Sequence, residues 1–465
     1  MKANLSNQSS DRKIVKLPKL LYLVVCLFSF NACLLNPIVQ SVLCPDKDSS
    51  FNPALWLLSP NPLVEFNQSW AGVRKGDNLQ LEARYYMYGY RIDTTFQWSS
   101  SNTSVATVDA NGFVQSIGNG KVYITAISGD GRASAISDIT VYSGFVYTSL
   151  DTSNSVSHLT MAPSTGLLIL SGTDLAGSGP TGITVNPSGK FLFTGDFYSD
   201  TISHFLIDQS DGTLTANATP TIPAGDRPRN LITTPDGKYL YLASEGTQTI
   251  RAYRVNVNGT LTFIDSYSTV IGQSQIQISR NGNFIFYLSP TLTELISYRI
   301  NYSDGTLTQA GVSPSFSNDG SGNVATHPNG RYLYVGSYPT LMIFNLDQET
   351  GSMSFVDSLN HSKSINGSAM HPSGLFYYLV HINEGIIACY TVDPKTGKIT
   401  YSSAATGYAA ISLRFMVIDP TGRFAYVAAN NGSNLFQFSI NQTTGELTSM
   451  GTVNAGGPQW NLIFL

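Results

Sequence analysis

Charged side chains are scarce in this sequence: they make up 12% of its 465 residues, and the net charge is -4. A protein that binds nucleic acid needs a dense basic surface, and no stripe of Lys and Arg along the chain supplies one. Gly, Tyr and Phe are abundant instead, together with small polar residues, and this composition favours strands and tight turns. The sequence therefore predicts an all-β protein that does not bind DNA or RNA.

Cysteine is also rare, with four residues in the whole chain. Cys26 and Cys33 lie near the amino terminus, which leaves Cys44 and Cys389 and no framework of disulfides. A bridge between Cys44 and Cys389 stays open as an alternative. Cys389 lies within an apolar run, however, and this favours a small buried side chain.

The common catalytic motifs are missing as well. The sequence contains no Gly-x-Ser-x-Gly elbow, no His-Glu-x-x-His pair and no Gly-rich phosphate loop that opens a helix. It indicates neither a metal site nor a cofactor.

Long apolar runs are limited to residues 20–30, which are too few to cross a bilayer comfortably. A basic segment precedes this run, and Ala32 and Cys33 follow it, as in a bacterial lipoprotein signal. We predict a signal peptide over residues 1–33 with lipidation at Cys33, so that the membrane is touched only through this anchor. The chain would then lie at the outer membrane or cell surface. Cleavage near Ala32, with release into the periplasm or medium, and an uncleaved anchor are the alternatives.

Residues 34–59 are interrupted by prolines and predict a linker, and residues 60–143 predict a small β-sandwich. Apolar and polar residues alternate over 78–83, 104–108 and 121–126, and Gly-containing turns separate these runs. We expect Trp98 to anchor the core of this sandwich, because a large ring contributes much apolar burial to a small domain.

Residues 96–112 and 120–126 also resemble a known family, the bacterial Ig-like group 2 domains. The matching run begins at Trp98, continues through Val105-Ala106-Thr107-Val108 and reaches the turn at Asn111-Gly112. This resemblance implies a spacer or adhesive module.

The chain from residue 144 to residue 465 repeats itself about every 44 to 48 residues. One marker is a turn before an aromatic-rich strand, at residues 187–189, 235–237, 280–282, 328–330, 372–374 and 420–422. The other marker is a hairpin glycine two residues before an aliphatic side chain, at Gly166, Gly212, Gly259, Gly305, Gly351, Gly397 and Gly445. Each repeat holds four strand-like runs, so we predict a seven-bladed β-propeller.

The two ends of this region predict how the ring closes. The first repeat begins at Phe145 without an innermost strand, whereas residues 460–465 form an innermost strand without a blade after it. The two parts complete one blade, which removes the free sheet edges of an open ring.

The repeat markers resemble those of the 6-phosphogluconolactonase and muconate-cyclase-like propellers over about 320 residues. This resemblance implies a site at Arg229 and Glu245, where the Arg and Glu of the family pattern are retained. The two family histidines are replaced by Asn230 and Thr181. Lactone opening needs a cation for the oxyanion and a base for water, and an adjacent arginine would hold Glu245 as an ion-paired carboxylate. A structural Arg229–Glu245 pair without enzymatic activity is therefore favoured, and a working lactonase site is the alternative.

Equivalent positions in the repeats predict a polar ring at the channel mouth that could take a small polar or anionic ligand. Its members are Thr181, Arg229 with its neighbour Asn230, Gln275, Asn323, Ser368, Arg414 and Gln459. A solvated channel lining is the alternative.

These observations favour an exported, surface-anchored binding or scaffold protein that displays a propeller on an Ig-like spacer, with a small ligand or a surface protein as its partner. The first alternative is a lactonase-type hydrolase that acts on a sugar lactone at the channel. The second alternative is an adhesin that acts through the Ig-like domain.

Overall fold

The computed structural model describes residues 62–465, apart from residues 88, 270–274, 289–292, 317–321, 362, 383 and 409–410. The described residues form strands joined by turns and loops, as predicted. None of them belongs to a helix long and apolar enough to cross a membrane. The predicted signal peptide, the lipidation site at Cys33 and the linker over 34–59 lie outside the described residues.

The chain divides into two compact units. The described residues of the first unit are 62–67, 82–97 and 126–135, apart from the gap noted above, and the second unit comprises residues 68–81, 98–125 and 136–465.

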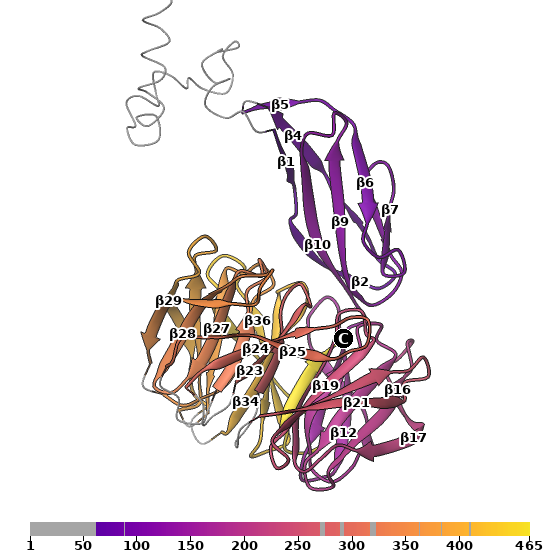
Figure 1. The fold of residues 1–465 in the computed structure, drawn as a ribbon, viewed down its shortest axis with the longest axis vertical. Coiled ribbons are helices and arrows are strands. Elements are labelled where there is room, and N and C mark those ends of the chain that lie inside the picture. Colours follow the sequence, from indigo (N-terminus) through magenta and orange to yellow (C-terminus); the bar gives the residue numbers. More distant parts are fainter. Residues whose placement is uncertain are drawn as a thin grey trace, which may run out of the picture. The chain divides into compact units, whose positions relative to one another are not determined.

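Ten short strands precede the propeller and form three sheets (Figure 1). The first sheet is β1 (Leu63–Phe66), β4 (Ala83–Met87) and β5 (Tyr90–Ile92). The second is β2 (Trp70–Arg74), β10 (Ser134–Tyr142), β9 (Gly120–Ser128) and β6 (Phe96–Ser100), and the third is β3 (Asn78–Gln80), β8 (Phe113–Ser116) and β7 (Ala106–Val108).

Aliphatic side chains make up most of the core of these strands. Val114, Val122, Ile124 and Ile139 are fully buried, in keeping with the alternation along their strands. Trp98 is only partly buried, and its ring lies against Gly112, where an added Cβ would come within 2.7 Å of the ring. Trp98 is thus less buried than these aliphatic side chains, and its role as the core anchor stays a prediction.

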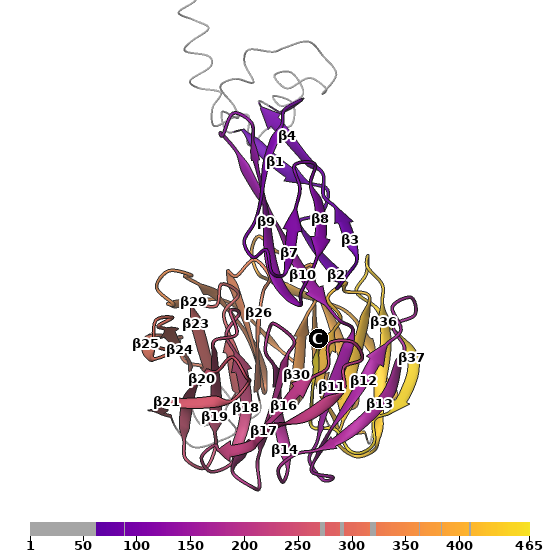
Figure 2. The same ribbon diagram turned by 90° about the vertical axis from the view of Figure 1, so that its right-hand side faces the viewer.

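Seven four-stranded sheets follow and form the blades of the propeller (Figures 1 and 2). From the innermost strand outward, blade 1 is β38 (Asn461–Phe464), β11 (Phe145–Leu150), β12 (Ser155–Met161) and β13 (Leu168–Leu175). Blade 2 is β14 (Pro180–Val185), β15 (Phe191–Asp196), β16 (Thr201–Ile207) and β17 (Leu214–Pro223), and blade 3 is β18 (Pro228–Thr233), β19 (Tyr239–Ser244), β20 (Thr249–Val255) and β21 (Leu261–Ser268).

The remaining blades have the same order. Blade 4 is β22 (Gln275–Ile278), β23 (Phe284–Leu288), β24 (Leu295–Ile300) and β25 (Leu307–Val312), and blade 5 is β26 (Gly322–Thr326), β27 (Tyr332–Ser337), β28 (Thr340–Leu346) and β29 (Met353–Asn360). Blade 6 is β30 (Ile365–Met370), β31 (Phe376–His381), β32 (Ile386–Val392) and β33 (Ile399–Ala405), and blade 7 is β34 (Leu413–Ile418), β35 (Phe424–Ala429), β36 (Asn434–Ile440) and β37 (Leu447–Asn454).

Blade 1 closes the ring with strands from both ends of the propeller. β38 pairs antiparallel with β11, so that Asn461 lies opposite Ser149 and Phe464 opposite Val146. The carbonyl of Leu465 accepts hydrogen bonds from the N–H groups of Gly144 and Phe145, at 2.7 and 3.1 Å. Figure 2 shows the last blade, with β36 and β37, beside β12 and β13 of the first. The predicted seven blades and their closure are confirmed.

The hairpin glycines lock neighbouring blades together. All seven have a positive φ, and a Cβ added to any of them would lie 2.3 to 2.7 Å from an aromatic ring of the adjacent blade. Gly212 lies against Phe145, for example, and Gly166 lies against Phe424 across the closure. In the same contacts Tyr147 Oη donates to the carbonyl of Gly212 at 2.9 Å, and Tyr426 Oη donates to that of Gly166 at 2.6 Å. The turn glycines and the aromatic strands thus form one repeated joint.

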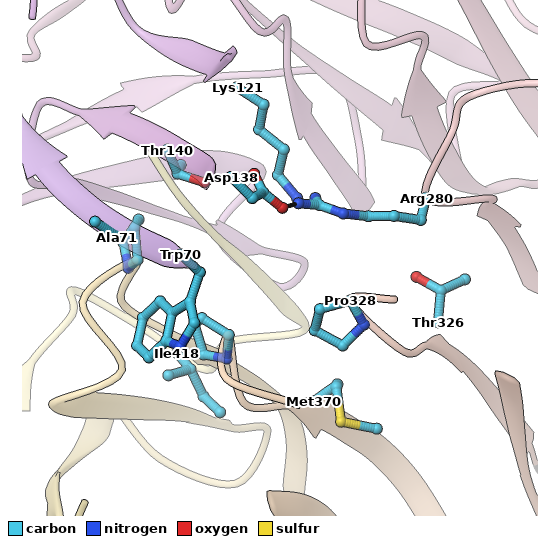
Figure 3. A pocket seen from close by; sticks show the side chains of 12 residues that line it. Trp70, Ala71, Lys121, Asp138, Thr140, Arg280, Thr326, Pro328, Met370 and Ile418 are labelled. Carbon is cyan, nitrogen blue, oxygen red and sulfur yellow. Dashed lines mark ion pairs between the residues drawn. The ribbon is translucent and has the colours of Figure 1, made fainter. Parts of the chain in front are cut away.

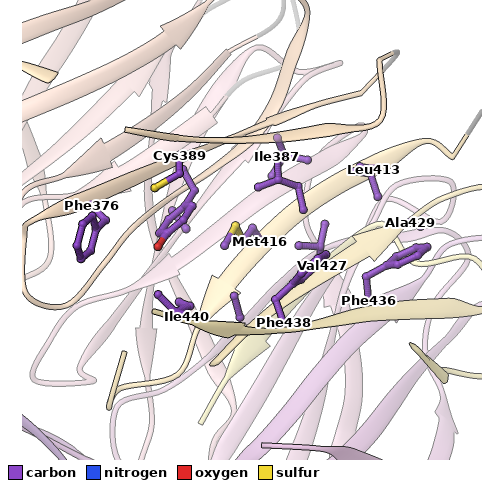
Figure 4. Close-up of a cluster of buried hydrophobic side chains, with 14 residues drawn as sticks. Phe376, Ile387, Cys389, Leu413, Met416, Val427, Ala429, Phe436, Phe438 and Ile440 are labelled. Atoms are coloured by element: carbon purple, nitrogen blue, oxygen red, sulfur yellow. The ribbon is translucent and has the colours of Figure 1, made fainter. Parts of the chain in front are cut away.

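The core between blades 6 and 7 shows what fills the space between sheets (Figure 4). Phe376, Ile387 and Val427 are buried there together with Cys389, which is 1% exposed. Burial raises the pKa of the Cys389 thiol to about 11, so it remains protonated at neutral pH. The prediction that Cys389 is a small buried side chain is confirmed.

Candidate functional site at the channel mouth

The innermost strands of the seven blades surround a central cavity of about 450 Å³. Its lining includes four of the residues predicted for the polar ring, namely Asn230, Gln275, Asn323 and Ser368. Ser368 Oγ donates to Asn323 Oδ1 at 2.8 Å, whereas Asn230 Oδ1 is buried without a hydrogen-bond partner among the described residues. The channel therefore has polar groups that could bind a ligand.

Bulges in the innermost strands turn individual side chains at one end of this channel. The pairing register shifts between Pro228 and Asn230 in β18, so that Arg229 is the extra residue, and it shifts between Leu413 and Met416 in β34, around Arg414. A bulge leaves its residue out of the ladder and re-aims its side chain. Thr181 in β14 and Asn366 in β30 occupy the corresponding bulges.

Arg229 is held from three sides. Its Nε donates to Glu245 Oε2 at 2.6 Å, and its guanidinium carbon lies 4.2 Å from the centre of the Phe197 ring and 5.3 Å from that of Trp460. The side chains of Arg229 and Glu245 are only 15% and 18% exposed, so this ion pair is partly shielded from water. Stacked and paired, the guanidinium has little freedom to turn.

Glu245 follows β19 and contacts a second cation. Its other oxygen, Oε1, lies 3.9 Å from a terminal nitrogen of Arg227. Both oxygens of this carboxylate therefore face guanidinium groups.

Arg414 lies on the same tryptophan as Arg229. Its guanidinium carbon is 4.4 Å from the centre of the Trp460 ring, and its Nε is buried without a hydrogen-bond partner among the described residues. Burial lowers the pKa of Arg414; the charge of Asp151 opposes this effect, and the charge of Arg229 adds to it. Arg229, Arg414 and Asp151 thus share one electrostatic environment around Trp460.

Asp151 is a further carboxylate at this end of the propeller. It directly follows β11, and burial raises its pKa, although the N–H of Thr152 and the charge of Arg414 act in the opposite direction. The guanidinium groups of Arg229 and Arg414 lie at this end of the channel, and such groups suit a substrate atom on which negative charge develops.

Four members of the predicted ring do not line this cavity, namely Arg229 and Arg414, which lie at the bulges described above, and Thr181 and Gln459, which are buried. Thr181 is 3% exposed and Thr181 Oγ1 donates to the carbonyl of Pro228 at 3.2 Å. Gln459 is fully buried, and its Oε1 accepts from the N–H of Ala429 at 3.2 Å. Both side chains tie neighbouring strands together.

Several residues of the mouth escaped the sequence-based prediction, namely Phe197, Trp460, Asn366 and Asp151. Arg229, Arg414 and Thr181 each lie six residues before the Pro of the next turn, and the same count gives Asn366, where Ser368 was predicted. A strict count from the turn markers would have found Asn366. Trp460 precedes Asn461 at the start of β38, where no turn follows to count from.

A second pocket lies in the larger compact unit (Figure 3). Trp70, Thr326 and Met370 contribute to its lining, and Arg280 forms an ion pair with Asp138 there. No residue with a predicted role lines this pocket, so the channel mouth is the better candidate site.

Comparison with known proteins identifies two families. The model of the family "Lactonase, 7-bladed beta-propeller" matches residues 211–365 and 360–463, and that of "Bacterial Ig-like domain (group 2)" matches residues 63–138. Both resemblances stated from the sequence are confirmed.

Individual relatives carry lactonase names. A 6-phosphogluconolactonase of Formosa agariphila is 28% identical over 38% of this chain and 53% of its own length. One from Enterobacter is 23% identical over 46% of this chain and 65% of its own length. The match thus spans between half and two thirds of these relatives. The periplasmic gluconolactonase of Pseudomonas aeruginosa superimposes with a TM-score of 0.61 at 18% identity, over 69% of this chain and 98% of that protein, which shows a shared fold.

These likenesses correct the leading functional interpretation. The sequence favoured a binding or scaffold protein without enzymatic activity, because the family histidines are replaced at Asn230 and Thr181. That order of preference is wrong, since the matching family model and the relatives are named as lactonases. The lactonase alternative is the better supported one.

Proposed function

Since this chain belongs to the family of seven-bladed β-propeller lactonases, we propose that it hydrolyses a sugar lactone at the mouth of its propeller channel. The observation that carries this proposal is Arg229, fixed by Glu245 and stacked between Phe197 and Trp460 at the channel mouth.

Arg229 would stabilise the negative charge that develops during hydrolysis. Water attacks the lactone carbonyl carbon, the carbonyl oxygen becomes an oxyanion, and the bond from that carbon to the ring oxygen then breaks to give a hydroxy acid. A cation that is already oriented stabilises such an oxyanion without having to reorganise. Among the described residues, the only hydrogen bond from the Arg229 guanidinium is the one from Nε, which leaves its terminal nitrogens for the substrate.

Glu245 is best suited to hold Arg229 in place. Because Arg229 and Arg227 approach its two oxygens at 2.6 and 3.9 Å, a proton taken up by this carboxylate would weaken two ion pairs. We propose that Glu245 is a positioning residue.

The substrate class rests on the chemistry of the mouth and on the names of the relatives. A lactone of the gluconic acid type has hydroxyl groups for Asn230 and Ser368, and the guanidinium groups of Arg229 and Arg414 would tolerate an acidic substituent. For the location of the activity, the basic and apolar amino-terminal segment supports export from the cytoplasm, with or without lipidation of Cys33.

The test is hydrolysis of D-glucono-1,5-lactone and of its 6-phosphate by the purified full chain, followed as proton release above the spontaneous rate. Removal of the oxyanion cation in Arg229→Gln should lower kcat/KM about 10²- to 10³-fold. Arg251→Gln is the matched control, because Arg251 also stacks on a ring, Phe263 at 5.0 Å, but belongs to β20 and not to an innermost strand.

The control should hydrolyse both lactones at the wild-type rate. A wild-type protein that does not exceed spontaneous hydrolysis with either lactone would contradict the proposed function.

A further inference from the structure

Lactone hydrolysis requires a group that takes a proton from water, and Glu245 is poorly placed for that task because guanidinium groups face both of its oxygens. The histidines that could have served elsewhere are absent at Asn230 and Thr181. Asp151 is a further carboxylate at this end of the propeller, and its charge and that of Arg414 act on each other.

Ring closure brings Asp151 to the mouth. Asp151 follows β11, and the carbonyl of Ser149, two residues earlier, accepts a hydrogen bond from the N–H of Trp460 at 2.9 Å. The ring of Trp460 in turn carries Arg414 at 4.4 Å and Arg229 at 5.3 Å. Asp151 therefore belongs to the blade that supplies the common platform of both arginines.

The carboxylate of Asp151 has the chemical properties of a base. It is half-buried, and burial raises its pKa, which makes it more basic than a carboxylate in water. The N–H of Thr152 donates a hydrogen bond to its Oδ1 at 2.9 Å. No side chain of the described residues donates a hydrogen bond to this carboxylate.

We propose that Asp151 is the general base of the reaction, which rests on the proposed lactonase function. One oxygen of Asp151 accepts a proton as the water oxygen bonds to the lactone carbonyl carbon, while Arg229 stabilises the oxyanion. When the bond to the ring oxygen breaks, this proton passes to the ring oxygen. The lactone and one water molecule yield one hydroxy acid, and Asp151 returns to its ionised form.

The charged groups around Asp151 determine how the rate depends on pH. Arg414 faces it from β34, Arg229 lies across Trp460 on β18, and Glu245 and Arg227 lie beyond Arg229. The arginines stay charged over the working range, so the loss of kcat/KM on the acid side should follow protonation of Asp151.

The test compares kcat/KM for D-glucono-1,5-lactone between pH 4 and pH 8 in the wild type, Asp151→Asn and Asp151→Glu. We expect Asp151→Asn to lower kcat/KM about 10²- to 10⁴-fold and to abolish the fall of kcat/KM at acidic pH. Its melting temperature should be unchanged, and added formate should restore part of the activity. Asp151→Glu should retain more activity, with its acid limb displaced. This second variant keeps the test decisive if the Asn variant fails to fold.

Asp265→Asn is the matched control. Asp265 Oδ1 accepts from the N–H of the next residue, Ser266, at 2.8 Å, as Asp151 does from Thr152, but Asp265 lies exposed on the outermost strand β21. It should keep the wild-type rate and pH profile. Two results would overturn the assignment of Asp151 and leave the lactonase function standing. One is wild-type activity in Asp151→Asn with the same loss of kcat/KM at acidic pH. The other is an acid-side loss in Asp151→Glu that occurs at the same pH as in the wild type. A wild type without turnover would overturn both.

Discussion

The joint between hairpin glycines and aromatic rings gives the most direct test of how the blades are held together. Gly212 has a φ of +81°, and a Cβ at this position would lie 2.7 Å from two atoms of the Phe145 ring, which is only 4% exposed. In Gly212→Ala the left-handed backbone costs about 1 to 2 kcal/mol. Crowding against a ring that is enclosed by its core costs about 1 to 3 kcal/mol more. The free energy of unfolding should therefore fall by about 2 to 5 kcal/mol.

Gly451→Ala separates the two contributions. Gly451 has a φ of +92°, but no atom lies within 4 Å of its added Cβ, so this variant should lose only the backbone contribution of about 1 to 2 kcal/mol. Urea unfolding followed by circular dichroism gives both free energies, and the double variant Gly212→Ala with Phe145→Leu should recover part of the loss. Equal losses in the two glycine variants, or no recovery in the double variant, would refute the joint between Gly212 and Phe145.

Two further predictions concern residues around Arg229. Trp460→Leu keeps an apolar side chain but removes the ring on which Arg229 and Arg414 stack. The loss of two cation–π contacts of about 0.5 to 1 kcal/mol each predicts a fall of about 5- to 30-fold in kcat/KM for the lactone. An unchanged kcat/KM would contradict the role of Trp460 as the platform of both arginines. Burial raises the pKa of Asp196 to about 6 against the hydrogen bonds from Ser203, Thr194 and Thr201, so the folded state holds this proton more tightly than the unfolded state. The free energy of unfolding should therefore fall by about 3 kcal/mol as pH rises from below 4 to above 6. Melting curves of Asp196→Asn should lack this slope, and a slope equal to that of the wild type would count against it.

The architecture could be read from the sequence because its signals are local. A hairpin glycine, a turn before an aromatic strand and an incomplete first repeat are each visible within a few residues, and together they predicted the pairing of Phe145 and its neighbours with the tail. Positive φ at every hairpin glycine is the physical reason that the marker recurs.

The mouth of the channel was harder to predict because bulges position it. A bulge adds a residue without leaving a turn signal, so equivalent positions drift, and Ser368 was predicted where Asn366 occupies the bulge. The sequence also did not show which polar side chains are buried. Thr181 and Gln459 are polar, yet both form hydrogen bonds to backbone groups of neighbouring strands. The contact between Arg414 and Trp460 depends on ring closure, which brings distant parts of the chain together.

The functional prediction failed for a related reason. The replacement of two histidines by Asn230 and Thr181 favoured a protein without activity, as though the chemistry required those residue types. Hydrolysis requires a base and a cation in the same place, and different side chains can meet that need when the fold brings them there. A carboxylate on the closing blade, such as Asp151, cannot be recognised from its sequence neighbours.

Closure of the ring and assembly of the mouth are therefore one structural event. β38 completes blade 1 through its pairing with β11, and the same strand pair places Trp460 beneath Arg229 of blade 3 and Arg414 of blade 7. An open ring would lose the platform of both arginines as well as its last sheet. Since Asp151 follows β11, the proposed base and the proposed oxyanion cation reach their positions only when the two ends of the propeller pair, so that a chain with an unpaired tail should be inactive even where blades 2 to 7 remain folded.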